Sequence, residues 1–193
     1  MVQQDTLMAT RFIGIGASLG GTTALQVLLP ALPPEFPAAV TLVFHRAKGP
    51  DETLVRFLRK NCRLPVEEAQ DKTPIRPGRL YFAPADYHLL VEDNHFALST
   101  EAAVSYARPS IDVLFESAAD AYGKNAVGIV LTGAGHDGAA GLAAIQRRGG
   151  LTIVQAPETA ECSGMPNAAM ATGMVDRTLA LESIVPFLVK WQD

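Results

Sequence analysis

Short, strongly apolar runs alternate along the chain with segments in which apolar residues recur every three or four positions. The runs predict β-strands at residues 11–15, 39–44, 126–131 and 151–155, because each is short and is bounded by polar or glycine-rich turns. The segment AVTLVF at 39–44 is apolar on both faces, which is typical of a central strand in a parallel sheet.

Helices are predicted between these strands. The first carries four leucines at helical spacing. Asp51 and Ser110 stand at helix starts as candidate N-caps, and Gly149-Gly150 ends the helix before the last predicted strand. The predicted helices lie at residues 22–32, 51–60, 110–122, 139–148, 166–172 and 183–191.

The region from Leu64 to Leu98 has a different pattern. It contains the short strand-like pieces LPVEEA, RLYFA, YHLLVE and HFALS, and Asp93-Asn94 between the last two predicts a β-hairpin. The whole pattern predicts an α/β fold: a doubly wound, mostly parallel sheet with helices on both faces and a short antiparallel hairpin. Such sheets bind ligands beyond the C-terminal ends of their strands, so candidate chemistry is sought there.

Composition narrows the class of protein. The chain has 193 residues and a formal charge of -4, which fits one domain spanning residues 1–193. Its 48% hydrophobic content excludes a disordered chain, and its mild acidity argues against a nucleic-acid or anionic-membrane partner. Two cysteines form neither a disulfide framework nor a metal motif. No leader or membrane-length apolar run is visible, so we expect a cytoplasmic protein without membrane insertion.

The first strand ends in the glycine-rich turn GIGASLGG at residues 14–21. Such a turn can bring a pyrophosphate to a helix N-terminus, expose the Ser18 hydroxyl as a nucleophile, or merely allow tight packing. The dinucleotide interpretation is the weaker one, because Leu19 occupies the position of the third glycine. In addition, His45 stands where the acidic ribose-binding residue is expected.

Two further strand ends carry titratable residues. His45 follows the second strand, where a histidine beside Ser18 can act as its base. Asp137 follows a buried strand and either caps the next helix or orients His45, while His136 is an adjacent alternative base. We interpret Ser18, His45 and Asp137 as a candidate catalytic triad assembled from three strand ends.

Several motifs follow one another along the chain: IGIGASLGGTTAL, VFHR, RPGRLYFAPADYHLLV, RPSIDVLFESAADAYG, AVGIVLTGAGHDGAAGL and GMPNAAMATGMVD. With these motifs the chain resembles the catalytic domain of the CheB family of chemotaxis protein-glutamate methylesterases from about residue 12 to 188. The resemblance implies a parallel α/β sheet and a serine-hydrolase triad that falls on Ser18, His45 and Asp137, with no metal and no cofactor.

Three positions depart from the family pattern. Leu19 stands where threonine is usual, Phe44-His45-Arg46 replaces Gln-His-Met, and Ala134 stands where methionine is usual. The backbone N–H of Leu19 remains a candidate oxyanion donor. The resemblance implies that the loop with Ala134 borders the active site, so Ala134 is a candidate oxyanion or substrate contact. Arg46 and Arg108 are candidates for a basic rim that would meet an acidic receptor.

The resemblance implies hydrolysis of glutamate γ-methyl esters on the cytoplasmic domain of a chemoreceptor, with glutamine deamidation as a related activity. Two alternatives stay open: a catalytically weak signalling or scaffold domain of the same fold, and a dinucleotide-binding module. Family members usually carry a receiver domain before the catalytic domain, and about ten residues precede the first expected strand. We therefore expect a catalytic domain alone, either controlled by a separate response-regulator receiver protein or cut from a longer chain.

Overall fold

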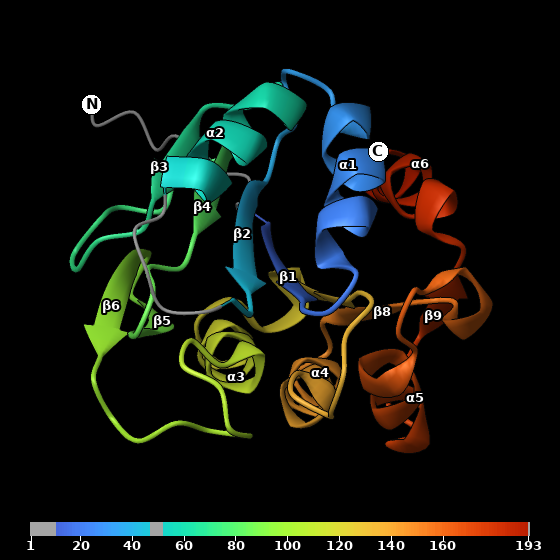
Figure 1. Cartoon of the computed structure of the whole chain (residues 1–193). Coiled ribbons are helices and arrows are strands. Elements are labelled where there is room, and N and C mark those ends of the chain that lie inside the picture. The colour runs from blue at the N-terminus through green and yellow to red at the C-terminus, as the bar shows by residue number, and fades with distance from the viewer. Residues whose placement is uncertain (1–10, 47–51, 193) are drawn as a thin grey trace, which may run out of the picture.

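A seven-stranded sheet forms the centre of the molecule in the computed structural model, which describes residues 11–46 and 52–192. Its strand order is β3-β4-β2-β1-β7-β8-β9, and every neighbouring pair is parallel (Figure 1). The strands are β1 (Phe12–Ala17), β2 (Ala39–Phe44), β3 (Val66–Glu68), β4 (Arg79–Phe82), β7 (Ala126–Val130), β8 (Leu151–Gln155) and β9 (Arg177–Leu179).

Helices cover both faces of this sheet. One face carries α1 (Gly21–Ala31), α2 (Glu52–Asn61) and α6 (Leu181–Gln192), and the other carries α3 (Ile111–Tyr122), α4 (Ala139–Arg147) and α5 (Gly164–Ala171) (Figure 1). Strands β5 (His88–Glu92) and β6 (His95–Ser99) form an antiparallel hairpin that packs against α3. Short 3-10 turns, η1 (Gly123–Asn125) and η2 (Pro157–Thr159), precede β7 and follow β8. The predicted fold class is confirmed.

The register of the central strands brings distant parts of the chain to one edge. Ala17 at the end of β1 pairs with Phe44 at the end of β2. The next residue on β2's side, His45, donates its backbone N–H to the carbonyl of Ala17 at 3.0 Å. On the other side of β1, the N–H of Ser18 donates to the carbonyl of Thr132 at 3.0 Å. The loops after β1, β2 and β7 therefore begin side by side.

Helix α3 approaches the sheet closely because the central strands lack side chains beneath it. A Cβ built on Gly14 of β1 would lie 2.7 Å from the ring of Phe115, and one on Gly16 would lie 2.5 Å from Ile111. Phe115 and Ile111 are both fully buried. Gly14 and Gly16 in the turn GIGASLGG are thus required for packing of α3 on β1, whatever role the turn has in a site.

The structure departs from the sequence expectations at a few elements. The short strand β9 was not predicted, because it has only three residues and two of them are exposed. Strands β3 and β4 belong to the parallel sheet. The sequence predicted short strands in this region but did not assign them to the parallel sheet. Asp51, a predicted N-cap, lies outside the described residues.

We predict that Gly14→Ala lowers the free energy of unfolding by about 1–3 kcal/mol, because the added methyl must displace the buried ring of Phe115. Urea unfolding followed by circular dichroism measures the change. Phe115→Leu vacates part of that volume, so the double variant should lose less stability than the sum of the single variants. Strictly additive losses would contradict the contact.

Candidate active site

Ser18 lies at the turn between β1 and α1. Gly20 has a φ of 80°, which lets the chain reverse sharply into α1 within three residues of the strand end. A Cβ built on Gly133 would lie 2.8 Å from the Cβ of Ser18, so the loop after β7 passes directly against the serine side chain. The sequence hypothesis that these two loops meet is consistent with this packing.

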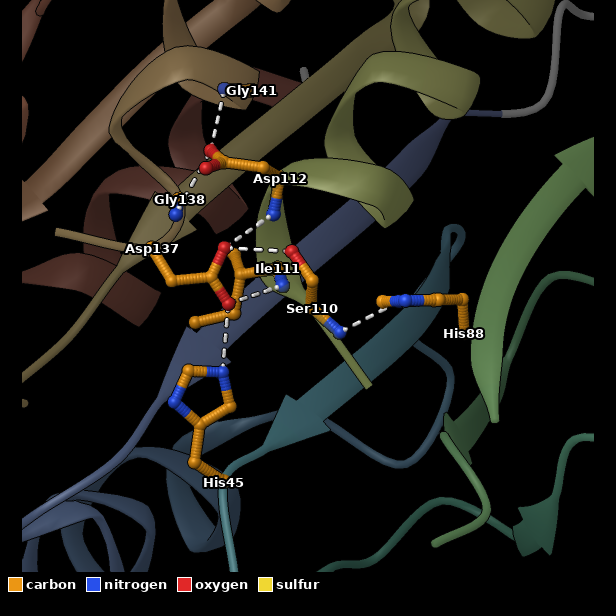
Figure 2. Close-up of polar contacts among 8 residues, drawn as sticks. All are labelled: His45, His88, Ser110, Ile111, Asp112, Asp137, Gly138 and Gly141. Atoms are coloured by element: carbon orange, nitrogen blue, oxygen red, sulfur yellow. Dashed lines mark hydrogen bonds and ion pairs between the residues drawn. The ribbon is translucent and has the colours of Figure 1, made fainter. Parts of the chain in front are cut away.

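His45 and Asp137 are in direct contact. Nε2 of His45 lies 2.8 Å from Oδ2 of Asp137, and the two side chains are 18% and 3% exposed (Figure 2). The histidine comes from the end of β2 and the aspartate from the loop between β7 and α4. The contact therefore joins strand ends on the two sides of β1.

Asp137 also caps the N-terminus of α3. Its Oδ1 accepts hydrogen bonds from the Ser110 hydroxyl at 2.8 Å and the Asp112 N–H at 3.0 Å, and its Oδ2 accepts from the Ile111 N–H at 2.8 Å (Figure 2). Burial alone would raise the pKa of Asp137. The hydrogen bonds from His45, from these two N–H groups and from Ser110 outweigh burial and lower the pKa. Asp137 is thus held as a carboxylate that can only accept.

This arrangement changes the role expected for Ser110. Ser110 stands at the N-cap of α3 as predicted, but its hydroxyl makes no cap hydrogen bond to the helix. It donates to Asp137 instead, and the carboxylate of Asp137 takes the free N–H groups. Asp137 also does not cap the helix that follows it, which was the alternative interpretation of the sequence.

That helix is capped by Asp112. Oδ1 of Asp112 accepts the N–H groups of Gly138 at 2.9 Å and Gly141 at 2.7 Å at the start of α4. Asp112 is 5% exposed. Burial raises the pKa of its carboxyl to about 6, and the nearby negative charge of Asp137 adds to the rise, against the lowering effect of the Gly141 and Gly138 N–H groups. The loop that carries Asp137 is therefore held by two caps: Asp137 caps α3, and Asp112 of α3 caps α4.

His88 is a further residue of this network that the sequence did not identify. It is 2% exposed, and its Nδ1 accepts the backbone N–H of Ser110 at 3.2 Å (Figure 2). Its Nε2 donates to the carbonyl of Ala102 at 3.0 Å. These partners set its neutral tautomer with the proton on Nε2. The sequence pattern of β5 gives no indication that His88 would contact Ser110, 22 residues further along the chain.

A cavity of about 810 Å³ opens beside the His45–Asp137 pair. Three of the residues predicted for substrate contact, Arg46, Arg108 and Ala134, line it together with His45 and Asp137, and so does His136. Leu19 does not line this cavity, and its side chain is 59% exposed. Ser18 does not line this cavity either, and its Cβ lies against Gly133.

The tautomer of His45 follows from its partner. Because Asp137 is ionised and can only accept, Nε2 of His45 carries the proton that joins them, and Nδ1 keeps a free lone pair. No hydrogen bond joins the Ser18 hydroxyl to His45 within residues 11–46 and 52–192. The pair is thus an imidazole oriented by a carboxylate, with a serine on the adjoining strand end.

Comparisons with known proteins identify the family of this chain. Residues 13–188 match the family model described as CheB methylesterase. The chain belongs to the CheB methylesterase family. Its fold matches the crystal structure of the Thermotoga maritima CheB methylesterase catalytic domain with a TM-score of 0.90 and 31% identity, covering 94% of this chain and 98% of that one.

Relatives of this CheB-family chain differ in length. A Leptospira interrogans protein with the provisional name protein-glutamate methylesterase/protein-glutamine glutaminase is 42% identical over 179 residues, which cover 92% of this chain and 93% of that protein. A protein-glutamate methylesterase/protein-glutamine glutaminase of Anaeromyxobacter dehalogenans is 44% identical over 170 residues, 88% of this chain and 50% of its own length. The chain therefore spans nearly all of one relative and half of the other.

The structure disfavours the dinucleotide alternative for this CheB-family chain. A pyrophosphate would need the N-terminus of α1, but the side chain of Glu161 packs against Gly20 there and its Oε2 lies 3.5 Å from the Thr23 hydroxyl. A carboxylate at that point repels phosphate. In the part of the chain that the structure describes, no group of three or more potential metal ligands occurs. Nor is any described helix long and apolar enough to cross a membrane.

We predict that Asp112→Asn becomes progressively more stable relative to the unsubstituted protein between pH 4 and pH 7.5. The folded pKa of Asp112, about 6, lies above the ordinary 3.8. The folded protein therefore holds this proton more tightly, and the stability it contributes is full below about pH 4 and is lost as the pH rises through 6. The loss amounts to at most about 3 kcal/mol, and asparagine, which cannot ionise, avoids it.

Urea unfolding of both proteins at the two pH values measures this difference. Asp120→Asn, on the exposed side of the same helix, is the matched control, since the Asp120 side chain is 70% exposed. A stability difference for Asp112→Asn that does not change with pH, like that of the control, would contradict a raised pKa at Asp112.

Proposed function

We propose that this chain hydrolyses glutamate γ-methyl esters on the cytoplasmic domain of a chemoreceptor, within the cytoplasm and as part of chemotaxis-type signalling. The observation that carries the proposal is the buried carboxylate of Asp137 on Nε2 of His45, one strand away from Ser18. The names of the relatives support the substrate, and the glutaminase part of those names supports deamidation of glutamine by the same residues.

The first half of the reaction uses the free nitrogen of His45. Nδ1 takes the proton of the Ser18 hydroxyl as Oγ attacks the ester carbonyl, and the imidazolium that forms is stabilised by the ionised Asp137. The tetrahedral intermediate collapses when His45 returns the proton to the methoxide oxygen. Methanol leaves, and a glutamyl ester of Ser18 remains.

Water completes the cycle through the same groups. His45 removes a proton from a water molecule as its oxygen attacks the glutamyl ester, and then protonates Oγ of Ser18 as that bond breaks. The products are glutamate and the regenerated enzyme. For a glutamine substrate the leaving group is ammonia, and the remaining steps are unchanged.

The oxyanion needs hydrogen-bond donors beside Ser18. The backbone N–H groups of Leu19 and Ala134 are suited to this role, since neither donates to another described backbone group and both adjoin the serine or its neighbour Gly133. Backbone donors do not depend on side-chain identity, so Leu19 and Ala134 can serve although the family usually has other residues there. Arg46 lines the cavity as the proposed contact to an acidic receptor, whereas Arg108, which also lines it, is bound to Asp86 and to the carbonyls of Thr100 and Glu101.

We predict that Ser18→Ala abolishes methanol release and that Asp137→Asn lowers kcat by at least about 10³-fold, because asparagine cannot stabilise the imidazolium. The assay is release of labelled methanol from a methylated receptor cytoplasmic domain. Ser183→Ala, in the exposed start of α6, is the control serine. Undiminished release by Ser18→Ala would reject the mechanism, and an unsubstituted protein that neither releases methanol nor reacts with a fluorophosphonate would favour the scaffold alternative.

We also predict the tautomer of His45. In the neutral ring of the free enzyme, Nε2 should be protonated and Nδ1 unprotonated, because Asp137 accepts from Nε2. The ¹⁵N shifts of the His45 ring in selectively labelled protein report both nitrogens directly. A protonated Nδ1 in the neutral ring would show that His45 cannot take the serine proton as proposed.

A further inference from the structure

A hairpin-like arm, residues 100–109, borders the cavity and ends in an unusual tip. Val104 and Ala107 exchange backbone hydrogen bonds of 3.1 and 2.9 Å. The two residues between them, Ser105 and Tyr106, have φ values of 50° and 63°. Two successive positive φ angles are the pattern of a tight two-residue turn that strongly favours glycine and asparagine, yet the arm places a serine and a tyrosine there.

The base of the arm is held by side chains. Arg108 donates from Nη1 to the carbonyls of Thr100 and Glu101, both at 2.9 Å. Its Nε and Nη2 donate to Oδ1 of Asp86 at 3.0 and 2.7 Å. Three successive carbonyls of the arm are thus fixed, because His88 donates to the next one, that of Ala102. These hydrogen bonds fix the orientation of the arm and therefore of the Ser105–Tyr106 turn at its tip.

The tip packs little against the described residues. Tyr106 is 98% exposed and Val104 is 39% exposed. An exposed aromatic ring in a backbone conformation that disfavours it does not stabilise the fold. Tyrosine on a rigid element is, however, a residue type that anchors protein interfaces, because it covers much area at a small loss of side-chain freedom.

The location of the arm indicates what its tip meets. Ser105, Tyr106 and Ala107 line the same cavity as His45 and Asp137. A methylated glutamate side chain occupies only a small part of about 810 Å³, so polypeptide on either side of the ester must fill the rest. The Arg108 charge at the base is offset by Asp86, so the tip offers a ring and methyl groups rather than a net charge.

We propose that the arm is a docking element for the polypeptide that carries the methylated glutamate, with Tyr106 packing against apolar side chains next to the ester. The inference rests on the proposed function and adds to it the surface that distinguishes a protein substrate from a small ester. Arg108 and His88 then act as positioning residues, through the arm, and the chemistry at Ser18 does not depend on Tyr106.

Two substrates separate docking from chemistry. The protein substrate is a chemoreceptor cytoplasmic domain carrying tritiated methyl esters, and the small one is p-nitrophenyl acetate. For Tyr106→Ala we expect KM for the protein substrate to rise roughly 5- to 30-fold with kcat nearly unchanged, while kcat/KM for the small ester stays the same. Tyr106→Phe should restore the KM, and Tyr87→Ala, at a 41% exposed tyrosine outside the cavity, is the matched control.

A double-variant cycle tests the positioning role of Arg108. If the arm works as a unit, Arg108→Ala raises the KM for the protein substrate, and adding Tyr106→Ala to it produces little further change. Fully multiplicative effects of the two substitutions would show that Arg108 acts on the substrate directly rather than by holding the arm.

Binding measurements keep this inference distinct from the proposed function. The Kd of the methylated receptor domain for Ser18→Ala, measured by calorimetry, should rise by the same factor when Tyr106→Ala is added. An unchanged Kd, an equal loss with Tyr87→Ala, or an equal loss of activity on p-nitrophenyl acetate would overturn the docking role. Undiminished methanol release by Ser18→Ala would instead reject the proposed function, whatever the state of the arm.

Discussion

Two buried aspartates at the centre of this protein each cap the helix beside the other aspartate, and the site depends on this pair of caps. Asp137, in the loop before α4, caps the N-terminus of α3, while Asp112, in the first turn of α3, caps the N-terminus of α4. Each carboxylate satisfies backbone N–H groups that a helix cannot satisfy itself. Each also lies where the helix dipole favours a negative charge. Neither helix can shift along the other without leaving buried donors and a buried charge unpaired.

The consequence for chemistry is that His45 is oriented by a group that cannot rotate. Asp137 uses both oxygens in the cap, so its contact with Nε2 of His45 has one direction. The glycines beneath α3 add a second constraint, because they bring that helix close to β1, from which Ser18 projects. The same network extends through Ser110 and His88 to Ala102. It therefore connects the His45–Asp137 pair to the arm that borders the cavity.

Periodicity was sufficient for most of the fold. Strands β2 and β8 were predicted at their observed bounds, since each is a short run rich in β-branched and apolar residues that is bounded by turn residues. The hairpin β5–β6 followed from its Asp93-Asn94 turn. Strand β9 was missed, because it is short and largely exposed and its place depends on pairing with β8. The capping residues were also not predicted. The sequence suggested Ser110 for α3 and Asp137 for α4, but Asp137 caps α3 and Asp112 caps α4, and each lies far along the chain from the helix start that it caps.

The sequence by itself determined the order of the strands and helices along the chain except for β9. It nominated the C-terminal edge of the parallel strands, with Ser18, His45 and Asp137, as the candidate site. These depend on local patterns and on the rule that parallel strands end at one edge. Only the tertiary structure decided that Asp112 and His88 support the site, that Glu161 lies at the start of α1, and that Arg108 holds an arm with Tyr106 at its tip. Apart from the Arg108 bonds to Thr100 and Glu101, these contacts join residues far apart in the chain, and their geometry exists only once the chain has folded.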